Sequence, residues 1–146
     1  MRDVNLVAGK FLHIDPACGQ RCLRQNRQAD ISAHALFEAV ATIAGACGST
    51  VSALTAHYLA TDSILIGGDD ALRARLLPAA AEGRLLGAFG LTEPNAGSDP
   101  GDMRTRAQRE GDGWRIRGRK CFISNGGVAD FIVVYAVTDP AAAHRG

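Results

Sequence analysis

The run Phe89-Gly-Leu-Thr-Glu-Pro-Asn-Ala-Gly-Ser-Asp99 and the run Cys121-Phe-Ile-Ser-Asn-Gly-Gly127 are the most informative parts of this chain. Both place hydroxyl side chains and glycines beside apolar residues typical of strands. Glu93-Pro94 favours an extended residue before the proline, and Asn95-Ala-Gly97 permits a turn with positive φ. Bends of this kind offer backbone N–H groups and side-chain oxygens to a flat polar ligand, although either run alone is also typical of an ordinary polar loop.

The second run predicts a strand with a mixed face. Phe122 and Ser124 have the same parity in an extended strand, so both would project to one side, with Ile123 opposite. A ring for stacking and a hydroxyl for hydrogen bonding on one face suit a flat aromatic ligand. The simpler interpretation is a core phenylalanine followed by a turn at Asn125-Gly126.

Residues 30–83 have a helical pattern. Alanine, the best helix former, is abundant, and apolar side chains recur at spacings of three and four residues. We expect Ser49 or Thr50 to cap the second of three helices. Asp69-Asp70 precedes the third, from Ala71 to Leu77, and adjacent carboxylates there are interpreted as caps rather than as a catalytic pair.

After Gly83 the pattern changes to alternation. Alternating residues on both sides of the turn Glu110-Gly-Asp-Gly113 predict an antiparallel hairpin with one solvated face. A further strand is expected from Lys120 to Ser124. The continuous apolar run from Phe131 to Val137 predicts a strand that is buried on both faces.

These patterns predict an α+β fold with an all-helical N-terminal half and antiparallel β-strands after it. We expect residues 1–86 to be a partial helical domain and residues 87–146 to be part of a β domain. A buried last strand would leave an unpaired sheet edge, which favours either a partner chain or further sequence after Gly146. Residues 1–29 show no clear period.

The composition indicates a soluble globular protein. Hydrophobic residues make up 47% of the chain and charged residues 21%, with a formal net charge of +1. The N-terminus lacks the pattern of a secretory signal, and the apolar region from Ile31 to Ile66 is interrupted too often for a transmembrane helix. We therefore predict a cytoplasmic protein without a membrane span.

The cysteines and histidines do not form a convincing metal motif. Cys18 and Cys22 would share a helix face near His13, but paired spacings on both sides of a loop are missing, so we predict free thiols and no metal. His34 and His57 lie within helical stretches and are interpreted as surface or packed side chains.

The predicted hairpin is basic. Between Asp102 and Lys120, seven basic residues stand against three acidic ones. Such a face can attract phosphate, but the only aromatic residue among these charges is Trp114, and charged outer faces are a common way to keep a sheet soluble. We predict no nucleic-acid binding. The basic residues are Arg104, Arg106, Arg109, Arg115, Arg117, Arg119 and Lys120.

Four runs in order, at nearly the expected spacing, resemble the acyl-CoA dehydrogenase family. They are Leu-Thr-Glu-Pro-Asn-Ala-Gly-Ser-Asp99, Asp-Gly-Trp-Arg-Ile-Arg-Gly-Arg-Lys120, Phe-Ile-Ser-Asn-Gly-Gly-Val-Ala-Asp130 and Val-Val-Tyr-Ala-Val-Thr-Asp-Pro140. The resemblance is strong over residues 85–140 and weaker over residues 35–84. It implies the end of the family's N-terminal helical domain and the start of its middle β-barrel domain.

The resemblance also implies a flavin site and a metabolic role. It implies FAD as cofactor, an acyl-CoA substrate, electron-transfer flavoprotein or a similar acceptor, a homo- or hetero-oligomer, and fatty acid metabolism. Family members more often have Trp and Thr where this chain has Phe122 and Ser124. Ser98 would also contact the acyl-CoA. The residues that would contact the flavin are Phe89, Leu91, Thr92, Gly97, Ser98, Phe122, Ile123 and Ser124.

The family's glutamate base has no counterpart in this sequence. In the family that base lies in a C-terminal helical domain, and none of Glu38, Glu82, Glu93 and Glu110 matches its position. We therefore assign no catalytic residue and expect this chain alone to bind flavin weakly or not at all, without turnover. The alternative is a noncatalytic subunit that docks on a full-length partner.

Overall fold

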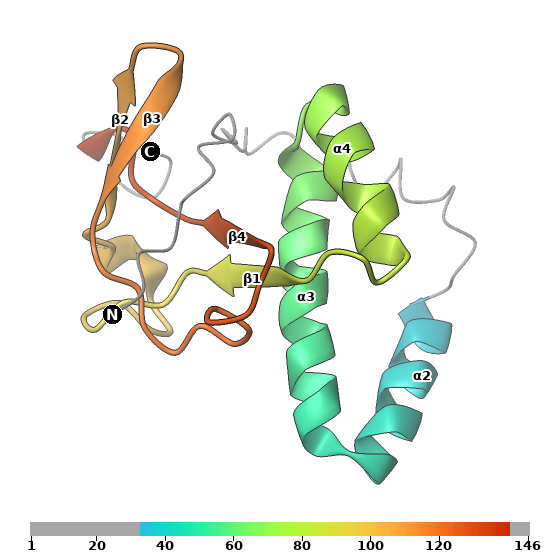
Figure 1. Cartoon of the computed structure of the whole chain (residues 1–146). Helices are drawn as coiled ribbons and strands as arrows, with labels where there is room; N and C mark the ends of the chain where they lie inside the picture. Colours follow the sequence, from blue (N-terminus) through green and yellow to red (C-terminus); the bar gives the residue numbers. More distant parts are fainter. Residues whose placement is uncertain (1–32, 141–146) are drawn as a thin grey trace.

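The computed structural model describes residues 33–140, which form three helices, four short strands and one turn of 3-10 helix. In Figure 1 the helices lie on one side, a β-hairpin lies on the other, and a pair of strands crosses between them. This arrangement confirms the predicted α+β class. The possible metal cluster of His13, Cys18 and Cys22 considered from the sequence lies outside the described residues.

The helices are α2 (Ala33–Ala46), α3 (Gly48–Gly67) and α4 (Asp70–Ala81). Asp69 caps α4, since its Oδ1 accepts a hydrogen bond of 2.8 Å from Leu72 N, as the sequence predicted. The predicted cap of α3 was wrong, because the helix begins at Gly48 and Cys47 occupies the N-cap position. Helix α4 also continues through Pro78 to Ala81 instead of ending before it.

The strands form two separate two-stranded sheets. Strands β2 (Arg106–Glu110) and β3 (Gly113–Arg117) pair antiparallel, which confirms the predicted hairpin. Its turn includes Gly111 at φ 56°, a backbone conformation that glycine adopts without strain. Strands β1 (Gly87–Gly90) and β4 (Phe131–Val134) pair parallel, with Gly87 opposite Phe131, whereas the sequence predicted antiparallel strands throughout.

Two further strand predictions need correction. Residues 118–129 form turns and irregular backbone, so the expected strand from Lys120 to Ser124 is absent there. The expected strand from Phe131 to Val137 is shorter, and its four β4 residues are half-buried rather than fully buried. The apolar run is continuous in sequence, but the described elements cover it only in part.

Helix α3 and strand β1 pack together through buried residues. Ala56, Ala60 and Ile64 recur at four-residue spacing on one face of α3, and all three are buried. A Cβ atom added to Gly87 would lie 3.0 Å from Ala60 Cβ, so the absence of a side chain there permits the close approach of strand and helix.

His57 links α3 to the start of β1. Its Nδ1 accepts a hydrogen bond of 2.9 Å from Gly87 N, and its side chain is buried. This confirms the interpretation of His57 as a packed residue. Within residues 33–140 no helix is long and apolar enough to cross a bilayer.

Candidate functional site

The two informative runs meet in space. Cys121 N donates a hydrogen bond of 3.0 Å to Thr92 O, and Lys120 Nζ donates one of 2.9 Å to Leu91 O. Because residues nearly thirty positions apart are joined by one backbone–backbone and one side chain–backbone hydrogen bond, the two runs form one structural unit. That the two runs share one flavin site stays a prediction.

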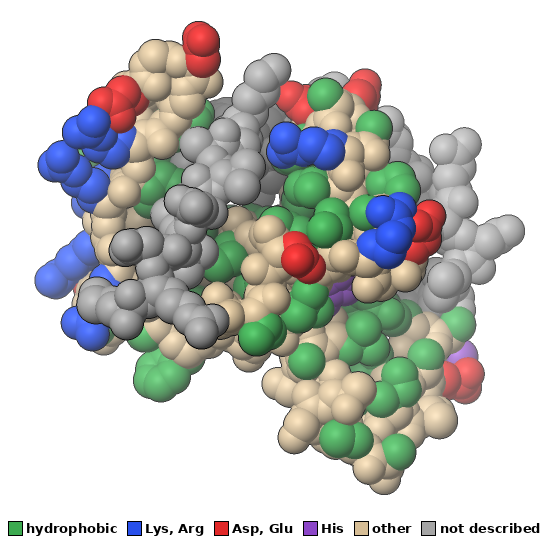
Figure 2. All heavy atoms as spheres, in the orientation of Figure 1, with side chains coloured by type: hydrophobic (Ala, Val, Ile, Leu, Met, Phe, Trp, Pro, Cys, Tyr) green, Lys and Arg blue, Asp and Glu red, His purple; other side chains and the backbone are tan. Residues whose placement is uncertain are grey.

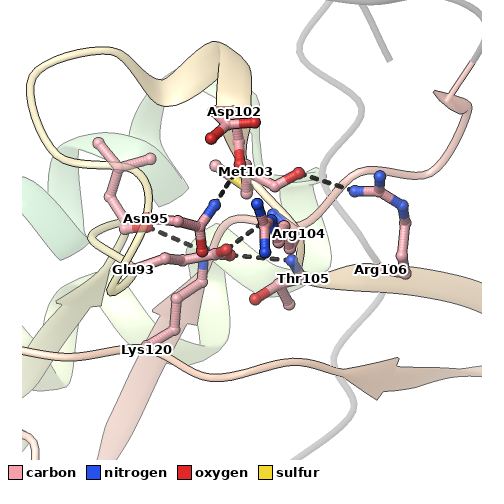
Figure 3. A network of polar contacts seen from close by, with 9 residues as sticks. Glu93, Asn95, Asp102, Met103, Arg104, Thr105, Arg106 and Lys120 are labelled. Atoms are coloured by element: carbon pink, nitrogen blue, oxygen red, sulfur yellow. Dashed lines mark hydrogen bonds and ion pairs between the residues drawn. The ribbon is translucent and has the colours of Figure 1, made fainter.

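Glu93 lies at the centre of this unit (Figure 3). Its side chain is almost fully buried, at 2% exposure. Oε2 accepts a hydrogen bond of 2.7 Å from Arg104 N, and Oε1 accepts one of 2.9 Å from Thr105 N. The Lys120 ammonium lies 2.8 Å from Oε1, so a carboxylate from the first run binds an ammonium that precedes the second.

These contacts keep Glu93 ionised. Burial alone would raise the pKa of Glu93, but the Lys120 ammonium and the hydrogen-bond donors around the carboxylate outweigh burial and lower the pKa to about 2. A carboxylate with these properties accepts hydrogen bonds but cannot take a proton at neutral pH. That Glu93 is not a general base stays a prediction, which its lowered pKa supports.

Asn125 joins the second run to the helices. Its Nδ2 donates hydrogen bonds of 2.8 Å to Ala53 O on α3 and 3.2 Å to Gly87 O on β1. Asn125 also has φ 65°, which asparagine tolerates better than most residues. One side chain therefore fixes a tight turn against two elements of the fold.

Replacing Asn125 by alanine is expected to lower the free energy of unfolding by about 2 kcal/mol. The change removes two hydrogen bonds and places a Cβ-bearing residue without a polar side chain in the left-handed region. Asn125→Gly removes the same hydrogen bonds without backbone strain and should cost about 1 kcal/mol. Urea unfolding curves measure both, and equal losses would show that strain contributes nothing.

The first run is a compact turn, although not of the predicted kind. Glu93 N and Ala96 O are 2.9 Å apart and Ala96 N and Glu93 O are 3.2 Å apart, which closes the bend. Asn95 Nδ2 donates a hydrogen bond to Asp102 O. Neither Asn95 nor Gly97 has positive φ, so that prediction was wrong. A Cβ atom on Gly97 would meet nothing within 4 Å.

The predicted flavin contacts differ in exposure. Phe89, Leu91, Thr92 and Ile123 are half-buried, and the Phe89 ring packs against Tyr135 with centroids 5.1 Å apart. The exposed residues are Gly97, Ser98, Phe122 and Ser124.

Phe122 differs most from its prediction. It has φ 55° and an exposed fraction of 92%. The extended strand that would have placed Phe122 and Ser124 on one face is not formed. The roles of all eight residues toward a flavin stay predictions.

The site residues that sequence reasoning missed are Lys120 and Asn125, together with the buried position of Glu93. Lys120 follows an alternating basic hairpin, so its charge was counted with the solvated ones. A signal was available in parity, because Lys120 has the parity of Trp114 and Ile116 rather than that of the outward arginines of the same strand.

The basic hairpin face is partly neutralised. Lys and Arg side chains gather over the hairpin in Figure 2. Arg115 forms an ion pair with Glu110, and the Arg109 guanidinium lies 5.7 Å from the centroid of the Trp114 ring. The absence of nucleic-acid binding stays a prediction, and these contacts support it.

The described residues also offer little for a metal ion. Within residues 33–140 no group of three or more His, Cys, Asp or Glu side chains is arranged to hold one. Cys47 and Cys121 are free thiols, as expected for these two.

Comparison with known proteins agrees with the geometry of the two runs. Residues 88–146 match the family model for the acyl-CoA dehydrogenase middle domain. This segment begins in β1 and includes both runs, the hairpin and β4. Over residues 88–146 the chain belongs to the acyl-CoA dehydrogenase family.

Individual acyl-CoA dehydrogenase relatives give the extent of the similarity. Cyclohex-1-ene-1-carbonyl-CoA dehydrogenase of Syntrophus aciditrophicus is 46% identical over 101 residues, which is 68% of this chain and 24% of the relative. The chain spans about a quarter of the length of the curated relatives it matches.

Solved structures agree. The crystal structure of glutaryl-CoA dehydrogenase from Mycobacterium smegmatis has a TM-score of 0.73 and 36% identity, and the match covers 86% of this chain and 35% of that one. A glutaryl-CoA dehydrogenase from the same organism in complex with FADH2 has a TM-score of 0.52 and 46% identity over 54% of this chain and 20% of that one.

Proposed function

We propose that residues 87–137 form one wall of an FAD pocket in an acyl-CoA dehydrogenase. The observation that supports this most directly is Phe122. Its ring is almost fully exposed although its backbone neighbour Cys121 is hydrogen-bonded to the first run. An exposed large aromatic ring on a fixed turn suits stacking against a flat ligand.

The surrounding groups fit the polar parts of a flavin. Thr92 and Ser124 each have a hydroxyl that can both donate and accept, and Ser98 and Gly97 lie exposed on the first run. The open space around Gly97 leaves its backbone accessible. We assign Thr92 to the pyrimidine edge, Ser124 to the reactive side of the ring system and Ser98 to the acyl-CoA as well.

The reaction we propose for the whole enzyme is α,β-dehydrogenation of an acyl-CoA thioester. Bound FAD supplies the hydride acceptor in this chemistry. The described residues contribute by binding and orienting the ring, and none of them is proposed as the base. An electron-transfer flavoprotein as acceptor, an oligomeric state and a role in fatty acid metabolism belong to the same proposal.

Replacing Phe122 by alanine is expected to weaken FAD binding by about tenfold while leaving the unfolding free energy within about 0.5 kcal/mol. Loss of a stacked ring removes ligand contacts, whereas an exposed side chain contributes little to folding. FAD fluorescence titration and urea unfolding of the chain give the two numbers. Because this chain alone is expected to bind FAD weakly or not at all, the titration should extend to high micromolar protein.

Phe37→Ala is the matched control, because Phe37 on α2 is also exposed, at 69%, and lies outside both runs. It should leave FAD binding unchanged. Equal binding by wild type and Phe122→Ala would remove Phe122 from the site.

A further inference from the structure

The ion pair between Glu93 and Lys120 connects three segments that are distant in sequence. Lys120 precedes the second run, Glu93 belongs to the first, and Arg104 and Thr105 lead into β2. The side chains of the pair are 2% and 12% exposed, for Glu93 and Lys120 respectively. A buried ion pair is costly to desolvate. Its position between the two runs therefore indicates a structural role that an exposed charged pair would not have.

On the first run, the contacts of Lys120 surround Thr92. The ammonium donates to Leu91 O before Thr92 and to the Glu93 carboxylate after it. Cys121 N binds Thr92 O directly. Three contacts from two adjacent residues therefore hold the backbone carbonyl groups of Leu91 and Thr92 and the side chain of Glu93.

On the second run, Lys120 and Cys121, which make these contacts, directly precede Phe122. With 92% of its surface exposed, Phe122 has almost no packing of its own to determine where its ring points. Its backbone conformation, at φ 55°, must be maintained by neighbouring contacts. Those contacts are Lys120 and Cys121 on one side and Asn125 on the other.

We propose that Glu93 and Lys120 are positioning residues, which hold Thr92 and Phe122 at the mutual placement that the flavin ring requires. The inference rests on the proposed flavin site, and it assigns to the pair no contact with the cofactor. Preorganisation of this kind increases ligand affinity because the protein loses less conformational freedom on binding.

The test compares Lys120→Met with Arg119→Met. Both remove one positive charge from adjacent residues, but Arg119 is exposed whereas Lys120 is in the buried pair. In the chain without FAD, we measure amide hydrogen exchange at Cys121 and at residues 89–92, together with global unfolding by urea. With FAD, we measure the dissociation constant and the visible spectrum of the bound flavin.

Lys120→Met is expected to accelerate exchange at Cys121 at least tenfold beyond the change in global stability, to weaken FAD at least tenfold and to alter the flavin spectrum. Lys120→Arg keeps the charge and hydrogen-bond donors, so its exchange rates, FAD affinity and flavin spectrum should stay close to those of wild type. Arg119→Met should change none of these three. Unchanged exchange at Cys121 in Lys120→Met would overturn the inference. Effects of Arg119→Met as large as those of Lys120→Met would overturn it as well.

The two proposals fail differently. If wild type binds no FAD, this chain alone does not complete the proposed pocket, while the exchange measurements still decide whether the pair fixes the two runs. If wild type binds FAD and Lys120→Met binds it equally, only the positioning role fails. Should Lys120→Met not fold, Glu93→Gln replaces it, and wild-type FAD affinity in that variant overturns the inference.

Discussion

Gly118→Ala is expected to lower the free energy of unfolding by about 3 kcal/mol. A Cβ atom at this position would lie 2.6 Å from both Cα and Cβ of Thr105. Thr105 is 1% exposed, and its backbone N–H is bound to the Glu93 carboxylate, so it cannot move away without loss of that hydrogen bond. The new methyl group must therefore displace the hairpin, the network around Glu93, or both.

Gly97→Ala is the control for this prediction. Nothing lies within 4 Å of a Cβ atom on Gly97, and its φ is outside the left-handed region. Alanine there should change stability by less than about 0.5 kcal/mol, with a small gain from a less flexible unfolded chain. Urea unfolding measures both variants, provided that the slope of unfolding free energy against urea concentration stays the same. An equal loss of unfolding free energy in Gly97→Ala and Gly118→Ala would contradict the steric explanation.

Local features of the fold could be predicted, because their causes lie within a few residues. The hairpin follows from the alternation on both sides of Gly111, and the start of α4 follows from the Asp69 cap. The parallel pairing of β1 with β4 was not predictable in this way. It depends on residues more than forty positions apart and on the close fit of Gly87 against Ala60.

In the candidate site, too, local features could be predicted from the sequence and long-range contacts could not. The two runs were identified because their residue types are unusual within a short stretch. The function of Lys120 was missed, since its charge was counted with those of the solvated arginines, and only the folded chain brings it to Leu91 and Glu93. Phe122 was placed in a strand because the pattern of apolar and polar residues contains no information about its positive φ.

Acid is expected to destabilise the wild-type chain by about 3 kcal/mol more than the Glu93→Gln variant between about pH 5 and pH 2. Although burial favours the protonated form, the hydrogen bonds to the carboxylate hold the pKa of Glu93 at about 2 in the folded chain, below the ordinary value of 4.5. A lowered folded-state pKa means that the ionised group stabilises the fold above pH 4.5. That stabilisation is lost as the pH falls through the folded-state pKa.

The comparison with Glu93→Gln isolates this group from the other carboxylates. Glutamine retains one acceptor for Arg104 N or Thr105 N but cannot ionise, so the variant is less stable at pH 7 and loses less on acidification. The difference in unfolding free energy between the two proteins should be constant above pH 5 and should shrink toward pH 2. Glu110→Gln, a change in an exposed ion pair with Arg115, serves as the matched control and should show a much smaller change. A difference between wild type and Glu93→Gln that stays constant down to pH 2 would show that Glu93 is not held ionised by its network.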